Sequence, residues 1–163
     1  YVACQNGHPE CAKLLLEASA AVNQAPQNGA TPLNIACLKG HLEVARLLLE
    51  AGGAVNQAKE DGATPLYIAC ERGQLECVQL LLEAGGAVNE ADEDGATPLF
   101  IACQQGRLEC ARLLCVAGAA VNQAKKNGVT PLFVACQQGH LECVQLLLET
   151  GAAEDQAQTQ GAT

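Results

Sequence analysis

Cysteine and histidine side chains recur at short spacing in this chain, and both residue types can bind zinc. The sets with this order are Cys4, His8 and Cys11; Cys37 and His41; and Cys136, His140 and Cys143. At other copies of the same pattern the histidine position holds Gln74 or Arg107, and the second cysteine position holds Val44. A position that accepts Val in place of Cys is typical of a small buried apolar side chain. We therefore expect core thiols and no metal site, with zinc binding as the alternative.

Few residues of the chain could serve as catalytic nucleophiles or bases. The only serine is Ser19, which stands where other copies of the pattern have glycine, and all three histidines occupy one position of the pattern. Positioned nucleophiles and bases are what general acid-base and covalent catalysis need. We expect no enzyme, no catalytic residues and no cofactor.

The ten cysteines raise the question of disulfide bonds. They occupy two recurring positions, apart from one at a leucine position: Cys4, Cys37, Cys70, Cys103 and Cys136; Cys11, Cys77, Cys110 and Cys143; and Cys115. Equivalent positions in neighbouring copies should lie about 8–10 Å apart, whereas a disulfide needs Cα atoms within about 7 Å. We therefore expect reduced thiols, in a cytosolic or nuclear setting, and predict a cytoplasmic location.

These side chains are positioned by a sequence repeat with a period of 33 residues. Its phrase Gly-Ala-Thr-Pro-Leu begins at Gly29, Gly62 and Gly95, returns at Gly128 with Val129 in place of Ala, and begins again at Gly161. Such a period is typical of stacked repeats, each of which buries its apolar face against its neighbours. We divide a single array, 1–163, into a partial unit 1–28, the units 29–61, 62–94, 95–127 and 128–160, and the start of another at 161–163.

One unit predicts two short helices and an extended arm. Thr31 followed by Pro32 is a helix start, so we expect a helix over 32–39, ended by Gly40. A second helix should cover 42–51, and residues 53–63 should form an arm that leads into a turn. Neither helix has the roughly 12–15 residues that an isolated helix needs, so contacts between units must stabilise the fold.

The period and its motifs resemble the ankyrin repeat. The matching motifs are Gly-Ala-Thr-Pro-Leu, Gly40-His41-Leu42-Glu43, the triple leucine Leu47-Leu48-Leu49, and Ala54-Val55-Asn56. The resemblance implies an all-α solenoid of stacked helix-turn-helix units joined by β-hairpin-like fingers. It also implies that finger tips and first helices form a concave surface that binds a partner protein.

Two positions depart from the ankyrin pattern. The family usually has His after Thr-Pro-Leu, where it ties neighbouring units together, but this chain has Tyr1, Asn34, Tyr67, Phe100 and Phe133. We expect that inter-unit hydrogen bond to be absent, with apolar packing in its place. The aromatic column has two interpretations, packing inside the stack or a partly exposed edge that contacts a partner. The usual Asp before Val-Asn is Ala, so a second turn-stabilising acceptor is missing.

The charge of the chain disfavours some partners. With 18 acidic and 9 basic residues the net charge is −9, whereas binding to nucleic acid depends on clustered Lys and Arg. No apolar run approaches the roughly 18 residues of a membrane span. We expect a soluble monomer that binds protein, with neither nucleic acid nor membrane as partner.

Positions that vary between units mark the candidate binding surface, because unvarying positions build the stack. We predict a non-catalytic protein-interaction module whose partner-binding residues are Tyr67, Glu71, Arg72, Asp92, Glu93, Asp94, Phe100, Gln104, Gln105, Lys125 and Lys126. The acidic finger tip 90–94 is either a solvated loop or a charged site for a basic partner segment.

The alternative function is a structural spacer, or a consensus-like array without a dedicated partner. A third hypothesis places an enzyme or channel domain outside this sequence.

Overall fold

The computed structural model describes residues 1–26 and 28–152, in which every regular element is an α-helix. The helices are α1 (Val2–Asn6), α2 (Pro9–Glu17), α3 (Pro32–Lys39), α4 (Leu42–Glu50), α5 (Pro65–Arg72), α6 (Leu75–Glu83), α7 (Pro98–Gln104), α8 (Leu108–Val116), α9 (Pro131–Gln138) and α10 (Leu141–Glu149). The all-α prediction is therefore confirmed. The end of the predicted unit 128–160 and the start of another at 161–163 lie outside the described residues.

Local signals fix where each first helix begins and ends. The Thr31 hydroxyl accepts a hydrogen bond from the Asn34 amide at 3.2 Å, and the equivalent threonines of the next three units do the same. Gly40 then ends α3 with a left-handed φ of 74°, so the predicted helix 32–39 is confirmed. The second helix ends one residue before the predicted position, because Ala51 is the cap of α4.

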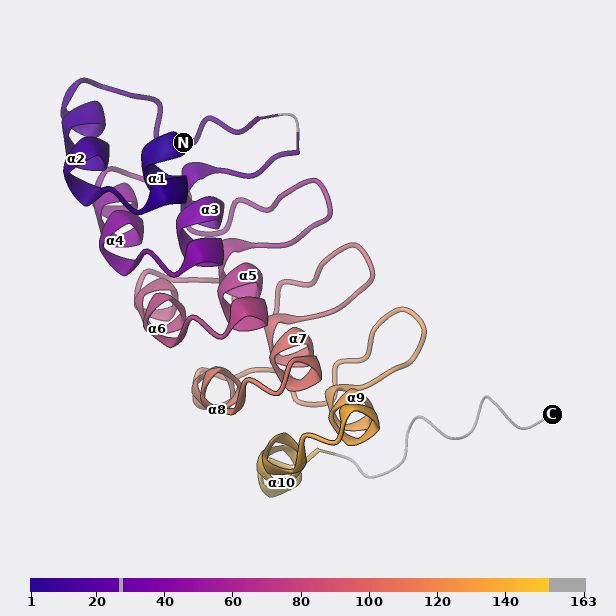
Figure 1. Cartoon of the computed structure of the whole chain (residues 1–163). Helices are drawn as coiled ribbons and strands as arrows, with labels where there is room; N and C mark the ends of the chain where they lie inside the picture. Colours follow the sequence, from indigo (N-terminus) through magenta and orange to yellow (C-terminus); the bar gives the residue numbers. More distant parts are fainter. Residues whose placement is uncertain (27, 153–163) are drawn as a thin grey trace.

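The helix pairs stack side by side into a curved array (Figure 1). The first helices α1, α3, α5, α7 and α9 form one row, the second helices form a parallel row, and the loops between pairs all project from the side of the first row. One continuous apolar cluster runs through the stack and includes a leucine from each of several units, such as Leu33, Leu66 and Leu99. Small neighbours such as Ala69 and Cys70, both 0% exposed, allow the helices to lie close together.

The predicted β-hairpin-like fingers form turns, but no strands occur in the described part of the chain. Within one finger the Lys59 amide donates to the Ala63 carbonyl at 3.0 Å. Between neighbouring fingers a single backbone bond repeats, for example from the Glu93 amide to the Asp61 carbonyl at 3.0 Å. One bond per finger pair holds the finger tips in a row without a continuous β-ladder.

At the position after Thr-Pro-Leu, the Asn34 side chain makes hydrogen bonds to residues of its own unit, 29–61. The Asn34 side-chain oxygen accepts from the Thr31 amide at 2.8 Å and from the Thr31 hydroxyl at 2.7 Å. Its side-chain nitrogen donates to the Gln57 carbonyl at 3.5 Å, in the following arm. An amide group can cap its own helix and reach the next segment because it carries both a donor and an acceptor.

Asparagine side chains also join the outer loops of neighbouring units. The Asn56 side-chain oxygen accepts from the Ala87 amide at 2.8 Å, and its nitrogen donates to the Gly85 carbonyl at 3.3 Å. Asn23 and Asn89 make the same two bonds to the units that follow them. This column supplies inter-unit acceptors although the usual aspartate before Val-Asn is absent.

We expect Asn56→Ala to lower the free energy of unfolding by about 1–2 kcal/mol, because two partly exposed backbone groups lose their partner. Chemical denaturation followed by circular dichroism measures the change. Gln57→Ala is the matched control, since its side chain lies next in sequence and is exposed. Equal losses in the two variants would contradict a role for Asn56 in joining the units.

Candidate functional site

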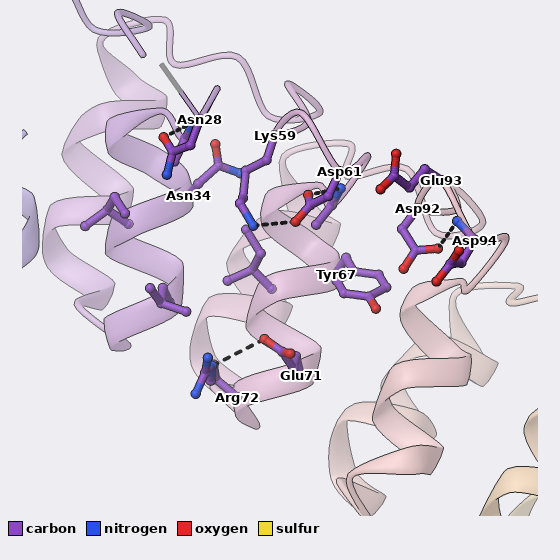
Figure 2. A pocket seen from close by; sticks show the side chains of 15 residues that line it. Asn28, Asn34, Lys59, Asp61, Tyr67, Glu71, Arg72, Asp92, Glu93 and Asp94 are labelled. Carbon is purple, nitrogen blue, oxygen red and sulfur yellow. Dashed lines mark hydrogen bonds and ion pairs between the residues drawn. The ribbon is translucent and has the colours of Figure 1, made fainter. Parts of the chain in front are cut away.

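A groove of about 520 Å³ crosses three successive units on the finger side of the stack (Figure 2). It is built by α3, α5 and the finger tips before α3, α5 and α7. The groove is lined by Asn28, Ala30, Asn34, Ile35, Leu38, Lys59, Asp61, Ala63, Tyr67, Ile68, Glu71, Arg72, Asp92, Glu93 and Asp94. Six of the predicted partner-binding residues therefore lie together: Tyr67, Glu71, Arg72, Asp92, Glu93 and Asp94.

The first helices give the groove an apolar lining. Ile35 and Leu38 come from α3 and Ile68 from α5, and all three line the groove, although Ile68 is only 5% exposed. Tyr67 is partly buried beside them, and its hydroxyl end points toward the finger that carries Asp92 and Asp94 (Figure 2). The groove thus combines aliphatic surface, one aromatic ring and charged finger tips, which is a composition that protein interfaces use.

Each of the two cations in the groove already has a carboxylate partner. The Lys59 Nζ lies 2.7 Å from an Asp61 carboxylate oxygen, and the Arg72 Nε lies 3.3 Å from a Glu71 carboxylate oxygen (Figure 2). The Lys59 bond and the backbone bond from Ala63 outweigh burial and lower the pKa of Asp61. All these side chains are at least partly exposed, so each pair contributes little stability.

Asp92 closes its finger turn through backbone hydrogen bonds, and no Lys or Arg forms an ion pair with it among the described residues. Its Oδ1 accepts from the Asp94 amide at 3.0 Å and from the Ala96 amide at 2.8 Å, which closes the finger turn. In the preceding finger Ala63 stands at the position of Ala96, and its amide donates to an Asp61 carboxylate oxygen at 3.1 Å. Asp92 therefore accepts the turn-closing hydrogen bond that Asp61 accepts in the preceding finger, and it also adds negative charge to the groove.

Tyr67 should stay protonated well above the ordinary range of a phenol. Burial first, and the negative charge of Asp92 second, raise the pKa of Tyr67. Because the unfolded chain loses this proton at a pH of about 10, the associated stability should fall as the pH rises above that value. Subtracting the titration of the Tyr67→Phe variant isolates the ultraviolet phenolate signal of Tyr67. We expect this signal to appear at a higher pH than the signal of an exposed tyrosine. In the Asp92→Asn variant the Tyr67 phenolate signal should appear at a lower pH than in the parent chain. An unchanged titration would contradict the electrostatic contact between Asp92 and Tyr67.

The structure places Phe100 in the core instead of on the surface. Phe100 is 2% exposed, and the Lys125 Nζ lies 5.5 Å from the centre of its ring. The same Lys125 nitrogen lies 3.6 Å from an Asp94 carboxylate oxygen, so this side chain bridges ring and finger. Gln104, Gln105 and Lys126 lie outside the groove. The aromatic column thus has mixed roles, since Phe133 is 39% exposed whereas Phe100 packs inside.

Several residues that line the groove were not among the predicted partner-binding residues: Asn28, Asn34, Ile35, Leu38, Lys59, Asp61 and Ile68. Lys59 and Asp61 stand at variable finger positions, so their variation between units was an available signal. Ile35 and Ile68 recur as aliphatic residues in every unit, which made them look like stack-forming residues only. Recurrence alone does not separate a residue that faces the stack from one that also lines a groove.

The prediction of core thiols is confirmed for seven cysteines, which are buried, and is wrong for Cys11 and Cys136, which are exposed. All ten cysteines are free thiols, and complete burial raises the pKa of Cys70 well above its usual range, which keeps that thiol protonated. The His41 Nε2 lies 3.3 Å from the Gln5 carbonyl oxygen of the preceding unit, and His140 makes the corresponding contact to Gln104. No three His, Cys, Asp or Glu side chains in residues 1–26 and 28–152 converge in a way that could hold a metal ion.

Comparison with protein-family models identifies the family of the chain. A family model described as ankyrin repeats (3 copies) matches residues 1–92, 52–125 and 84–160. The search of the curated proteins found no match. Within the described residues, the helices are too short or too polar to cross a membrane.

Proposed function

The chain belongs to the ankyrin repeat family, and from this premise we propose that it is a non-catalytic module that binds a partner protein on its concave face. Ankyrin repeats are in general protein-interaction modules. The proposed surface is formed by the finger tips and the first helices, with the groove at its centre. Its central residues are Tyr67, Glu71, Arg72, Asp92, Glu93 and Asp94. Gln104, Gln105, Lys125 and Lys126 would extend it toward the next finger, whereas Phe100 is left out because it is buried.

The groove is the observation that carries this proposal. It is hollow, it crosses three units, and it combines variable charged tips with aliphatic and aromatic side chains. Interfaces typically combine an apolar centre with a charged rim, and Tyr and Arg are enriched among the residues that dominate binding energy. Interface backbones usually move little on binding, so the partner would meet a preformed surface.

We propose that the protein lies in the cytoplasm and is a monomer. Buried thiols such as Cys37, Cys70 and Cys103 would remain reduced in that compartment. Copies of the chain should repel one another because each has a net charge of −9. The same negative charge disfavours nucleic acid as a partner.

The alternative is a spacer or consensus-like array without a dedicated partner. One feature favours it: Gln104-Gln105 is repeated as Gln137-Gln138, so these positions vary little between units. A spacer needs no groove contacts, which makes the two hypotheses separable by substitution.

The test is a crosslinking pull-down from lysate with three forms of the chain. The groove variant combines Tyr67→Asn with Asp92→Lys. Both introduced residue types already occur at the equivalent positions of the preceding unit, where the chain has Asn34 and Lys59. The control variant combines Gln79→Ala with Glu83→Lys on the exposed side of α6, which changes the net charge equally. Circular dichroism must show equal folding of the three forms.

A protein captured by the parent and the control variant but lost from the groove variant would support the proposed surface. Equal capture by all three forms, or capture by none, would contradict it and leave the spacer hypothesis ahead.

A further inference from the structure

The groove holds more negative charge than its own cations neutralise. Its acidic residues are Asp61, Glu71, Asp92, Glu93 and Asp94. Lys59 and Arg72 are occupied by Asp61 and Glu71, and Asp94 shares Lys125 at 3.6 Å. Among the residues that the structure describes, no Lys, Arg or His lies within ion-pair distance of Asp92 or Glu93. Two carboxylates at the edge of the groove thus remain without a cation.

The shape of the groove adds a requirement that charge alone does not. The apolar side chains of Ile35, Leu38 and Ile68 line the groove together with the partly buried ring of Tyr67. A ligand that covers this lining and also neutralises Asp92 needs an aliphatic stem with a cation at its end. Arginine and lysine side chains have this form, because they bury their methylene groups and keep the charged end at polar partners.

We propose that the groove takes an arginine side chain from an extended segment of the partner protein. The methylene groups would lie against the partly exposed aliphatic side chains of the lining, such as Ile35 and Leu38, and the guanidinium would meet Asp92 and Glu93 beside the Tyr67 ring. Arginine fits better than lysine because its planar fork can bind a carboxylate through two nitrogens, stacks on aromatic rings and sheds water more readily. This inference rests on the proposed function, which requires only that a protein bind this face.

Asp92 makes this part of the array different from its neighbours. Lys59 and Lys125 occupy the corresponding position of the adjacent fingers. Within the unit 95–127, Lys125 extends over the ring of Phe100, whereas in the unit 62–94 the shorter Asp92 leaves the Tyr67 ring partly exposed. A negative charge and an accessible ring are therefore combined at one position only among the described fingers.

The experiment is selection of a phage-displayed library of random linear peptides on the immobilised chain, followed by sequencing of the selected peptides. We expect arginine to be enriched on the parent and not on Asp92→Lys, which introduces the residue of the neighbouring fingers. Glu83→Lys on α6 changes the net charge equally and should keep the enrichment, since it lies away from the groove.

Affinities of one selected peptide then test the chemistry at the level of single groups. Asp92→Lys should weaken binding at least about tenfold, and replacing the peptide arginine by neutral citrulline should cost a similar factor. Replacing it by lysine should weaken binding about threefold to tenfold. Asp92→Asn keeps the turn acceptor and should still weaken binding, whereas Tyr67→Phe keeps the ring and should stay within about twofold.

The outcomes separate this inference from the proposed function. Arginine enrichment that depends on Asp92 supports the inference. Peptides that need the groove but show no preference for arginine would overturn it and leave the protein-binding function standing. Arginine peptides that bind Asp92→Lys as well as the parent, or no selected peptide at all, would also overturn it, and the pull-down decides the proposed function by itself.

Discussion

Replacing Leu81 by Ala should lower the free energy of unfolding by about 2–5 kcal/mol. Leu81 lies in α6, is 0% exposed, and belongs to the apolar cluster that runs through the stack. Truncation would remove buried methyl groups and leave a cavity between helices of neighbouring units. Because short helices depend on these contacts, the loss should spread beyond the unit that carries the substitution.

Leu15→Ala is the matched control for this prediction. Leu15 occupies the same position of the repeat as Leu81 but is 50% exposed in α2. The same chemical change should therefore cost clearly less there. Urea denaturation followed by circular dichroism measures both variants, with the slope of the transition checked because repeat arrays can unfold in steps. Equal losses would show that burial by neighbouring units does not determine the stability of the array.

Helix ends were predictable from sequence because their signals are local. Thr31 and Pro32 start α3 and Gly40 ends it, and all three act within a few residues of the chain. The end of α4 was missed by one residue: Ala51 is the cap, and Gly52, which was expected to end the helix, follows it with a left-handed φ of 87°. The family resemblance added the stacking order, which helix signals alone do not give.

Contacts between units were less predictable. Asn56 binds backbone groups of Gly85 and Ala87, which are distant in the sequence, so no local pattern marks its role. Which carbonyl lies within reach depends on how far one unit is displaced from the next.

Exposure at a repeated position depends on the neighbouring finger. Tyr67 and Phe100 stand at the same position of successive units, and both were predicted to contact a partner. The long side chain of Lys125 covers Phe100, whereas Asp92 is too short to cover Tyr67 in the same way. The sequence therefore identifies the column, and the structure separates the partly exposed ring from the buried one.

Gly62→Ala should lower the free energy of unfolding by roughly 2–3 kcal/mol, since a left-handed residue costs about 1–2 kcal/mol and a lost hydrogen bond about 1 kcal/mol. Gly62 has a φ of 83°, and a β-carbon there would lie 2.8 Å from the Glu93 nitrogen and 2.9 Å from the Asp92 Cα. Both atoms belong to backbone, which cannot swing aside. The two fingers would have to separate, and the bond from the Glu93 amide to the Asp61 carbonyl would weaken.

Gly52→Ala isolates the backbone strain from this collision. Gly52 has a φ of 87°, but a β-carbon there would meet nothing within 4 Å, so only the strain should remain. Urea denaturation of both variants gives the difference, and equal losses would show that the finger row yields without cost. Because Asp92 and Glu93 belong to the finger that Gly62 supports, Gly62→Ala should also weaken peptide binding in the groove. Gly52→Ala should leave that binding unchanged, which ties the packing of the fingers to the shape of the proposed recognition site.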